Sequence, residues 1–86
     1  MDETALIERY IEANPNHTGV DEARLKDFGV SVWALVAYFH GTGNDIQRVA
    51  NGYAVPSEAV QAALGYYRGH RASIDARIAA NAAAVG

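Results

Sequence analysis

The sequence contains no cysteine, and other scarcities also narrow the range of functions. Without cysteine the chain has no disulfide, no thiolate metal ligand and no cysteine nucleophile, which is consistent with a reducing cytoplasm. No apolar run approaches the roughly 20 residues that a membrane-spanning helix needs. Residues 1–9 carry Asp2, Glu3 and Glu8 and do not resemble a signal peptide. We therefore expect a cytoplasmic protein that does not contact a membrane.

Basic residues are also scarce. Seven Lys and Arg stand against ten Asp and Glu, for a formal net charge of −3. Residues 1–43 hold three basic and seven acidic residues, whereas residues 44–86 hold four and three. Nucleic acids attract proteins through clustered Lys and Arg, so a single copy is not expected to bind nucleic acid avidly.

The residues that serve most often in catalysis are scattered. His17, His40 and His70 do not have the spacing of three or four that places two metal ligands on one helix face. Ser31 and Ser57 are predicted to lie at helix starts rather than to act as nucleophiles. We expect no catalytic site, no cofactor and no metal.

What the chain does have is a high apolar content: half of its 86 residues are apolar, which predicts one folded domain, residues 1–86. Leu6 and Tyr10 are four apart, which favours a helix over residues 4–12, with a strand near its end as the alternative. Residues 14–22 form a predicted loop, and 23–30 a short extended element. Residues 1–22 are thus an N-terminal helix and loop.

The next segment, residues 31–72, has the spacing and caps of a helix-turn-helix core. Val32 and Leu35 begin an amphipathic helix that follows a Ser31 N-cap and ends at Gly41 and Gly43. Asn44 or Asp45 caps a second helix, which Gly52 is predicted to close. Pro56 then lies where a third helix begins.

The third helix is predicted to run from Ser57 to about Ala84, with residues 73–86 as an extension beyond the core. Its apolar residues follow a repeat of 3.5, which is typical of paired helices, and glycine permits close approach of a second backbone. Glycine also weakens a helix, so a bend or break near Gly65 or Gly69 is an alternative. We predict a homodimer whose seam is formed by Val60, Leu64, Gly65, Tyr67, Ile74 and Ile78.

The predicted second and third helices, joined by the turn before Pro56, could also bind in the major groove of DNA. In helix-turn-helix proteins, the first turns of the second helix contact the base edges. The candidates for such contacts, and for contacts to phosphates, are Arg48, Ser57, Gln61 and Arg68. Gln61 suits adenine, but Glu58 opposes phosphate, so the alternative is a helix-turn-helix with a purely structural role.

The order and spacing of apolar residues over about two thirds of the chain resemble domain-of-unknown-function family 433. The resemblance includes a V-W-x-L-V-like helix at residues 32–36, an I-x-x-V-A-x-x-Y helix at 46–53, and the stretch AVQAALGYYRGHRASID at 59–75. Two positions depart from the family pattern: DFGV at residues 27–30 lacks the usual arginine, and Tyr53 is followed by Ala54 where proline is common.

This resemblance implies a homeodomain-like three-helix core preceded by a small β element. It also implies an antitoxin of the VapB type, which would bind a PIN-like nuclease toxin and operator DNA. We therefore expect a mainly α fold with an N-terminal helix, a short β element, the core and an extended C-terminal helix. Two functions stay open: an antitoxin-like DNA-binding regulator, or a protein-interaction module that does not bind DNA.

Overall fold

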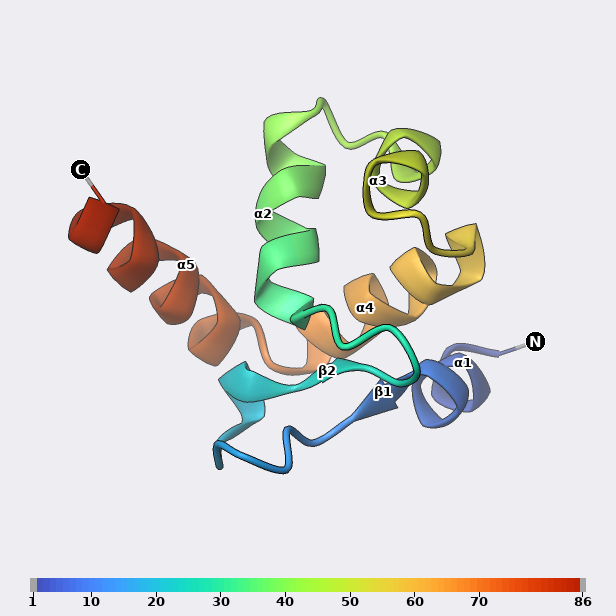
Figure 1. The fold of residues 1–86 in the computed structure, drawn as a ribbon, viewed down its shortest axis with the longest axis horizontal. Helices are drawn as coiled ribbons and strands as arrows, with labels where there is room; N and C mark the ends of the chain where they lie inside the picture. The colour runs from blue at the N-terminus through green and yellow to red at the C-terminus, as the bar shows by residue number, and fades with distance from the viewer. Residues whose placement is uncertain (1, 86) are drawn as a thin grey trace.

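A computed structural model describes residues 2–85 of the chain. Within this range it contains five α-helices, one 3₁₀ helix and a two-stranded antiparallel sheet (Figure 1). The elements in chain order are α1 (Glu3–Tyr10), β1 (Ile11–Glu12), η1 (Val20–Glu22), β2 (Arg24–Leu25), α2 (Val32–Gly41), α3 (Ile46–Tyr53), α4 (Ser57–Gly69) and α5 (Arg71–Val85). The prediction of a mainly helical fold with a short β element is confirmed.

The N-terminal segment contains both of the structures that its sequence allows. Asp2 caps α1 by accepting a hydrogen bond of 2.8 Å from a backbone amide in the first turn. The chain becomes extended after Tyr10, and Ile11 in β1 then pairs with Leu25 in β2. The predicted helix over residues 4–12 is thus correct as far as Tyr10, and the strand alternative is correct beyond it.

The extended element predicted over residues 23–30 is present as β2 and a tight turn. The amide of Leu25 donates to the carbonyl of Val30 at 2.8 Å, and the amide of Gly29 donates back to Leu25 at 3.0 Å. Asp27 and Gly29 both have left-handed backbones, with φ of 67° and 69°, a conformation that Asp and Gly tolerate best. This turn directs the chain from the sheet into α2.

The second helix of the predicted core ends two residues later than expected. Asp45 caps α3 by accepting a hydrogen bond from the amide of Arg48 at 3.1 Å. The prediction that Gly52 closes this helix is wrong, because α3 continues to Tyr53 and Ala54 takes the left-handed capping conformation, with φ of 55°.

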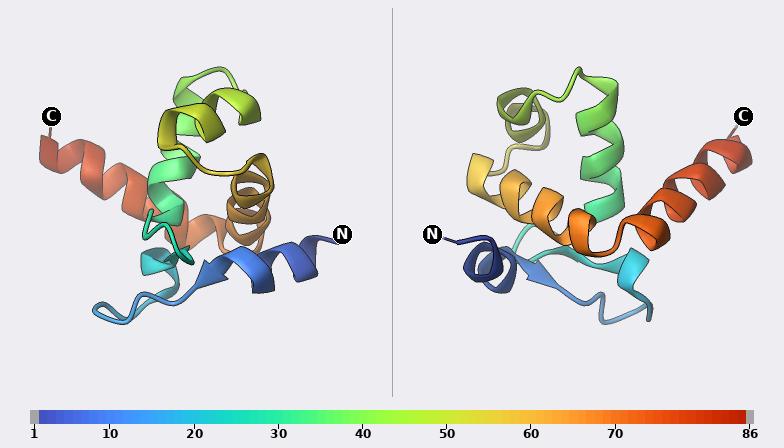
Figure 2. Two further views of the ribbon diagram at one scale, coloured as in Figure 1. Left: turned by 45° about the vertical axis from the view of Figure 1, so that its right-hand side comes forward. Right: turned by 180° about the vertical axis from the view of Figure 1, so that it is seen from behind.

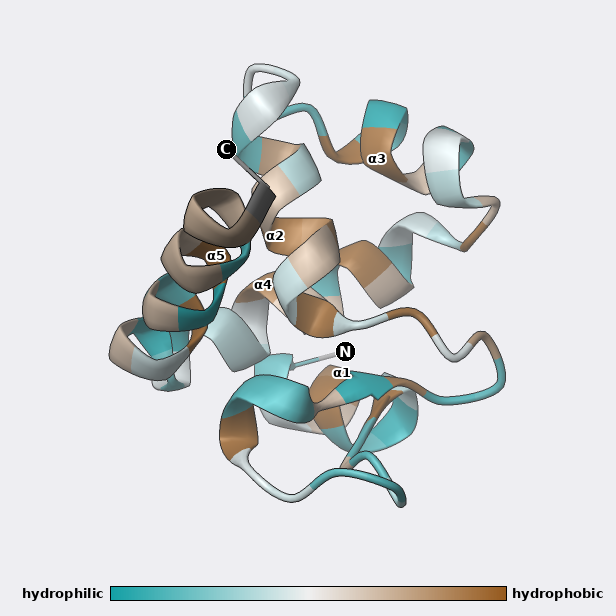
Figure 3. Ribbon diagram, turned by 60° about the vertical axis from the view of Figure 1, so that its left-hand side comes forward, coloured by the Kyte–Doolittle hydropathy of each residue, from teal (hydrophilic) through white to brown (hydrophobic). Residues whose placement is uncertain are grey.

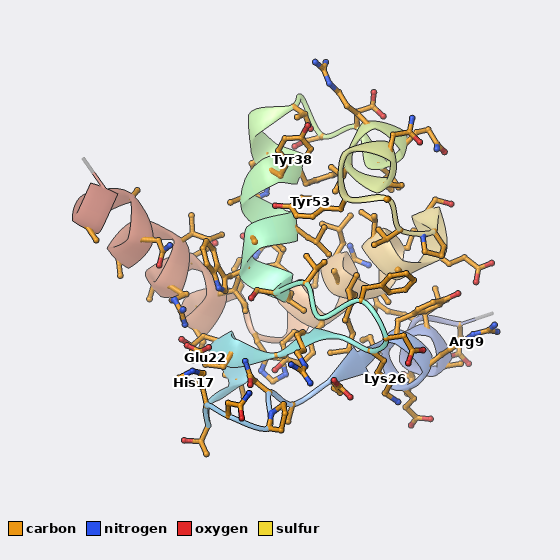
Figure 4. The ribbon with its side chains drawn as sticks, viewed as in Figure 1. Arg9, His17, Glu22, Lys26, Tyr38 and Tyr53 are labelled. Atoms are coloured by element: carbon orange, nitrogen blue, oxygen red, sulfur yellow. The ribbon has the colours of Figure 1, made fainter. Side chains whose placement is uncertain are left out.

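Gly52 has a packing role instead. A Cβ atom at this position would lie 3.0 Å from Cε2 of Tyr38 on α2. The absence of a side chain lets Tyr38 settle against α3, where its ring meets Tyr53 edge-to-face at 5.6 Å (Figure 4). The tyrosine pair therefore joins α2 to α3.

α4 is the central helix of the core and packs against α1, α2 and α3 (Figure 2). Small side chains let the neighbouring helices come close to it. Its buried residues are Ala59, Val60, Ala62, Ala63, Leu64, Gly65 and Tyr67. Only a narrow strip of α4 is left at the surface.

The predicted single helix from Ser57 to about Ala84 is in fact two helices, and the alternative of a break near Gly69 is correct. His70 leaves the helical region, with φ of −138° and ψ of 37°, and its amide bonds to the carbonyl of Tyr67 at 3.0 Å. α5 then departs in a new direction (Figure 1). The bend stabilises the fold, because it packs α5 against α2 and η1 and buries the apolar side chain of Ile74 completely.

The predicted dimerisation seam is not an exposed stripe. Val60, Leu64 and Ile74 are 1%, 8% and 0% exposed within the single chain. Gly65 and Tyr67 are also buried, and Ile78 is half-buried. These residues need no second copy to cover them, because α1, α2, α3 and η1 pack over α4 and α5 within the chain. Dimerisation itself stays a prediction.

Candidate functional site

The four residues predicted to face DNA differ in exposure, and only two of them line one cleft. Arg48 is exposed on α3, and Ser57 is half-buried at the start of α4. Gln61 and Arg68 are exposed further along α4 and line the same cleft, whereas Arg48 and Ser57 lie outside it. The structure therefore brings together two of the four.

This cleft lies between α1, α3 and α4 and has a volume of about 220 Å³. Its apolar lining comes from one residue of each of the three helices, and its polar lining from α1 and α4. The lining residues are Leu6, Ile46 and Leu64, with Glu3, Gln61 and Arg68.

α1 lies across α4 and is fixed to it near both ends. Near one end, Glu3 forms an ion pair with Arg68. Near the other, Tyr10 Oη donates a hydrogen bond of 3.3 Å to Glu58 Oε2. Leu6 is buried between these two contacts. The face of α4 that would enter a DNA groove is therefore partly occupied by another helix of the same chain.

The charges on this face also suit DNA poorly. The Arg68 guanidinium, a candidate phosphate contact, already has the Glu3 carboxylate as its partner. Glu58 adds a second carboxylate near the start of α4. Since phosphate attracts exposed cations and repels carboxylates, the surface over α4 is close to neutral rather than basic.

α5 offers a second surface, and its N-terminal half is fixed to the rest of the chain. Ile74 is fully buried, and Arg77 Nη1 lies 3.3 Å from Asp21 Oδ2 and also pairs with Glu22. The same guanidinium lies 5.2 Å from the ring centroid of Trp33 on α2, a cation–π distance. These contacts fix the direction in which α5 projects from the core (Figure 2).

Most of the other described side chains of α5 are exposed, and its outer half is rich in alanine. In Figure 3 its later turns are light brown, whereas much of the loop between β1 and β2 is teal. The helix thus presents a smooth, weakly apolar surface with few charges. The exposed residues are Arg71, Ala72, Ser73, Asp75, Ala76, Ala79, Ala80, Ala82, Ala83 and Ala84.

A second cleft, of about 300 Å³, lies on the other side of α1. Tyr66 of α4 closes part of it by donating a hydrogen bond of 2.7 Å to the carbonyl of Val20. Burial, and to a smaller extent the charge of Asp21, raises the pKa of the Tyr66 phenol. The residues that line this second cleft are Ile7, Glu8, Ile11, Glu12, Ala13, Gly19, Ala23 and Tyr66.

The junction of α4 and α5 holds a small polar cluster. Tyr67 Oη donates a hydrogen bond of 2.7 Å to Asp75 Oδ1, and Arg71 and His40 lie against its ring. The hydrogen bond to Asp75 is the main reason that the pKa of Tyr67 is raised, and burial adds to it. The cluster ties the first turns of α5 to the end of α4.

The described residues offer neither a metal cluster nor a membrane-spanning helix. Between residues 2 and 85, no group of three or more His, Asp or Glu side chains is placed to hold a metal ion. None of the helices in this range combines the length and the apolar content that crossing a bilayer requires.

Sequence reasoning missed the contacts that decide how α1 and α5 are placed. Neither Glu3 nor Tyr10 was expected to touch α4, and Arg77 was not linked to Trp33. The pairs Glu3–Arg68 and Arg77–Glu22 are 65 and 55 residues apart in the chain. No local spacing signals such contacts, because the fold brings them together.

Comparisons with protein-family models, with curated proteins and with solved structures find no match to this chain. The resemblance to family 433 thus stays a prediction that rests on the sequence alone.

Proposed function

We propose that this chain is a protein-interaction module, in which the helix-turn-helix is structural and α5 is the arm that a partner protein binds. The observation that carries the proposal is the position of α1, which covers α4 and pairs Glu3 with the best-placed cation, Arg68. The surface left for a partner is α5, which is anchored by Ile74 and Arg77 and exposed beyond them.

The chemistry of α5 defines the partner. Alanines on a regular helix let another surface approach closely, so the expected partner is a protein with an apolar groove that accepts one helix. The resemblance to VapB-type antitoxins makes a PIN-like nuclease the first protein to test. An antitoxin role is the specific form of this proposal.

DNA binding by a homeodomain-like α2–α3–α4 core is the second candidate. It is supported by the exposure of Arg48 and Gln61, on the two helices of the turn. It is opposed by the cover that α1 provides and by the carboxylates of Glu3 and Glu58.

Two variants separate the candidates. Ala79→Gln with Ala83→Gln adds bulk to one face of α5 without changing charge or greatly changing helix propensity. Arg48→Glu with Gln61→Glu reverses the surface that would meet DNA. The readouts are capture of a PIN-like nuclease and retardation of the DNA upstream of the chain's own gene at low salt.

We expect the α5 variant to lose nuclease capture, and the Arg48/Gln61 variant to keep it. The proposal fails if nuclease capture is unchanged by the α5 variant, or if the DNA is retarded and only the Arg48/Gln61 variant abolishes that retardation.

A further inference from the structure

We propose that α5 can be exchanged between two copies of this chain, so that the α5 of each copy docks on the α2 and η1 of the other. The partner is a second copy, and the surface is the one that α5 already covers within its own chain. This inference does not rest on the proposed function, because it uses the docked face of α5 rather than the exposed one.

The first observation is the shortness of the hinge. His70 is the single residue between α4 and α5 that is not helical. Gly69 before it is exposed, and a Cβ atom there would meet nothing within 4 Å. One residue changing to helical dihedrals would therefore join α4 and α5 into one rod of residues 57–85, about 43 Å long.

The second observation is that α5 docks mainly on elements other than α4. Ile74 is buried, and Arg77 binds Asp21 and Glu22 of η1 and lies over Trp33 of α2. Because an identical surface exists on a second copy, a swapped α5 would make the same contacts there. The burial of Ile74 is thus preserved in both arrangements.

The third observation concerns the backbone at the hinge. The amide of Ile74 donates to the carbonyl of His70 at 3.0 Å, and residues 71–73 precede it in the first turn, where amides lack intrahelical partners. A continuous rod would give these amides the carbonyls of residues 67–69. The apolar residues on either side of the hinge, Tyr67 and Ile74, are seven apart and stay in one 3.5-residue repeat, with Arg71 as a charged interruption between them, so the sequence also suits the straight form.

Opposing contacts hold the bent form. Tyr67 donates to Asp75 across the junction, and the ring of Tyr66 lies 4.4 Å from that of His70. Straightening the hinge pulls Asp75 away from Tyr67. Weakening these contacts should therefore increase the population of the swapped dimer.

A charge-exchange pair tests the swap directly. One variant is Arg77→Glu, and the other is Asp21→Lys with Glu22→Lys. In either variant alone, residue 77 faces like charges whether α5 docks on its own chain or on an identical copy. In a mixed swapped dimer both junctions regain opposite charges, whereas a mixed dimer without exchange regains neither.

After the two variants are refolded together at high concentration, we expect native mass spectrometry to show a one-to-one heterodimer more abundant than either homodimer. Variants that fold alone and form no such heterodimer would overturn the proposal.

Two further variants, both at the hinge between α4 and α5, test the proposal if the charge-exchange variants do not fold. His70→Ala with Tyr67→Phe removes the stacking and the hydrogen bond, and should tighten the wild-type dimer by about 10-fold in sedimentation equilibrium. Arg71→Pro suits the first position of α5 but would clash inside a continuous rod, and should leave only monomer. The swap is excluded if the first variant is no more dimeric than wild type, or if Arg71→Pro dimerises as well as wild type.

Discussion

The side chain of Glu3 occupies the space that a Cβ atom on Gly65 would need, since such an atom would lie 2.7 Å from Glu3 Cγ. Gly65 is buried in α4 and Glu3 is half-exposed on α1. Gly65, which was predicted to lie in a dimer seam, is therefore the point at which the chain's own N-terminal helix crosses α4.

This relationship predicts an unequal effect of alanine at two glycines of α4. Gly69→Ala should stabilise the fold by up to about 1 kcal/mol, because alanine favours the helix and finds open space. Gly65→Ala should stabilise the fold by about 1 kcal/mol less than Gly69→Ala does, because Glu3 must move away from Arg68 to make room for the new methyl group. Urea denaturation of both variants measures the difference.

The control for this comparison is Glu3→Ala. With the Glu3 side chain absent, Gly65→Ala should stabilise the fold about as much as Gly69→Ala does, in a double-mutant cycle. Equal effects of the two glycine substitutions in the wild-type background would contradict the contact.

The second prediction concerns Ile74, which is core rather than interface. Ile74→Ala should lower the free energy of unfolding by about 2–5 kcal/mol, whatever the protein concentration, because it leaves a cavity under α5. The neighbouring exposed Ser73→Ala should change it by less than about 0.5 kcal/mol. A loss of stability that appears only at concentrations where wild type is dimeric would restore the interface interpretation.

A third prediction follows from the contacts of Arg77. Arg77→Met keeps an unbranched side chain but removes the charge, and should lower stability by about 1 kcal/mol, less in high salt. Trp33 is the only tryptophan, so its fluorescence reports directly on the loss of the guanidinium 5.2 Å from its ring centroid. The matched control is Arg48→Met, at an exposed position of α3, which should leave the fluorescence of Trp33 unchanged.

Features of the fold that depend on neighbouring residues could be predicted from this sequence, whereas features that depend on residues distant in the chain could not. The predicted caps at Ser31 and Asp45 and the apolar spacing in α2 are local, and they located the starts of α2 and α3 correctly. The end of α3 was misplaced because Gly52 is explained by Tyr38, a residue of another helix. The low helix propensity of glycine placed a possible break near Gly69, but the sequence could not choose the broken form over a continuous helix, since that choice depends on the pocket that α2 and η1 offer to Ile74.

The site was less predictable than the fold for the same reason. Gln61 and Arg68 were correctly expected at the surface, but the helix that crosses over them was not. Whether α3 and α4 can reach DNA depends on what packs on α4. The helix that packs there is α1, whose Glu3 is 65 residues from Arg68 in the chain.

The last prediction concerns alkaline pH. The pKa of Tyr67 is raised above 10.0 in the folded chain, mainly by its hydrogen bond to Asp75. A raised pKa means that the folded state favours the neutral phenol more than the unfolded state does. Its contribution to stability is therefore complete below pH 10 and is lost as the pH rises through the folded-state pKa.

Thermal unfolding between about pH 8 and 12 tests this. The wild-type melting temperature should fall more steeply above pH 10 than that of Tyr67→Phe, which has no phenol to ionise at this position. Asp75→Asn should show an intermediate slope, because burial of Tyr67 continues to raise the pKa after the main cause is removed. Tyr66 also has a raised pKa and is present in all three proteins, so it contributes equally to each. Identical slopes for wild type and Tyr67→Phe would show that the hydrogen bond between α4 and α5 does not form in solution.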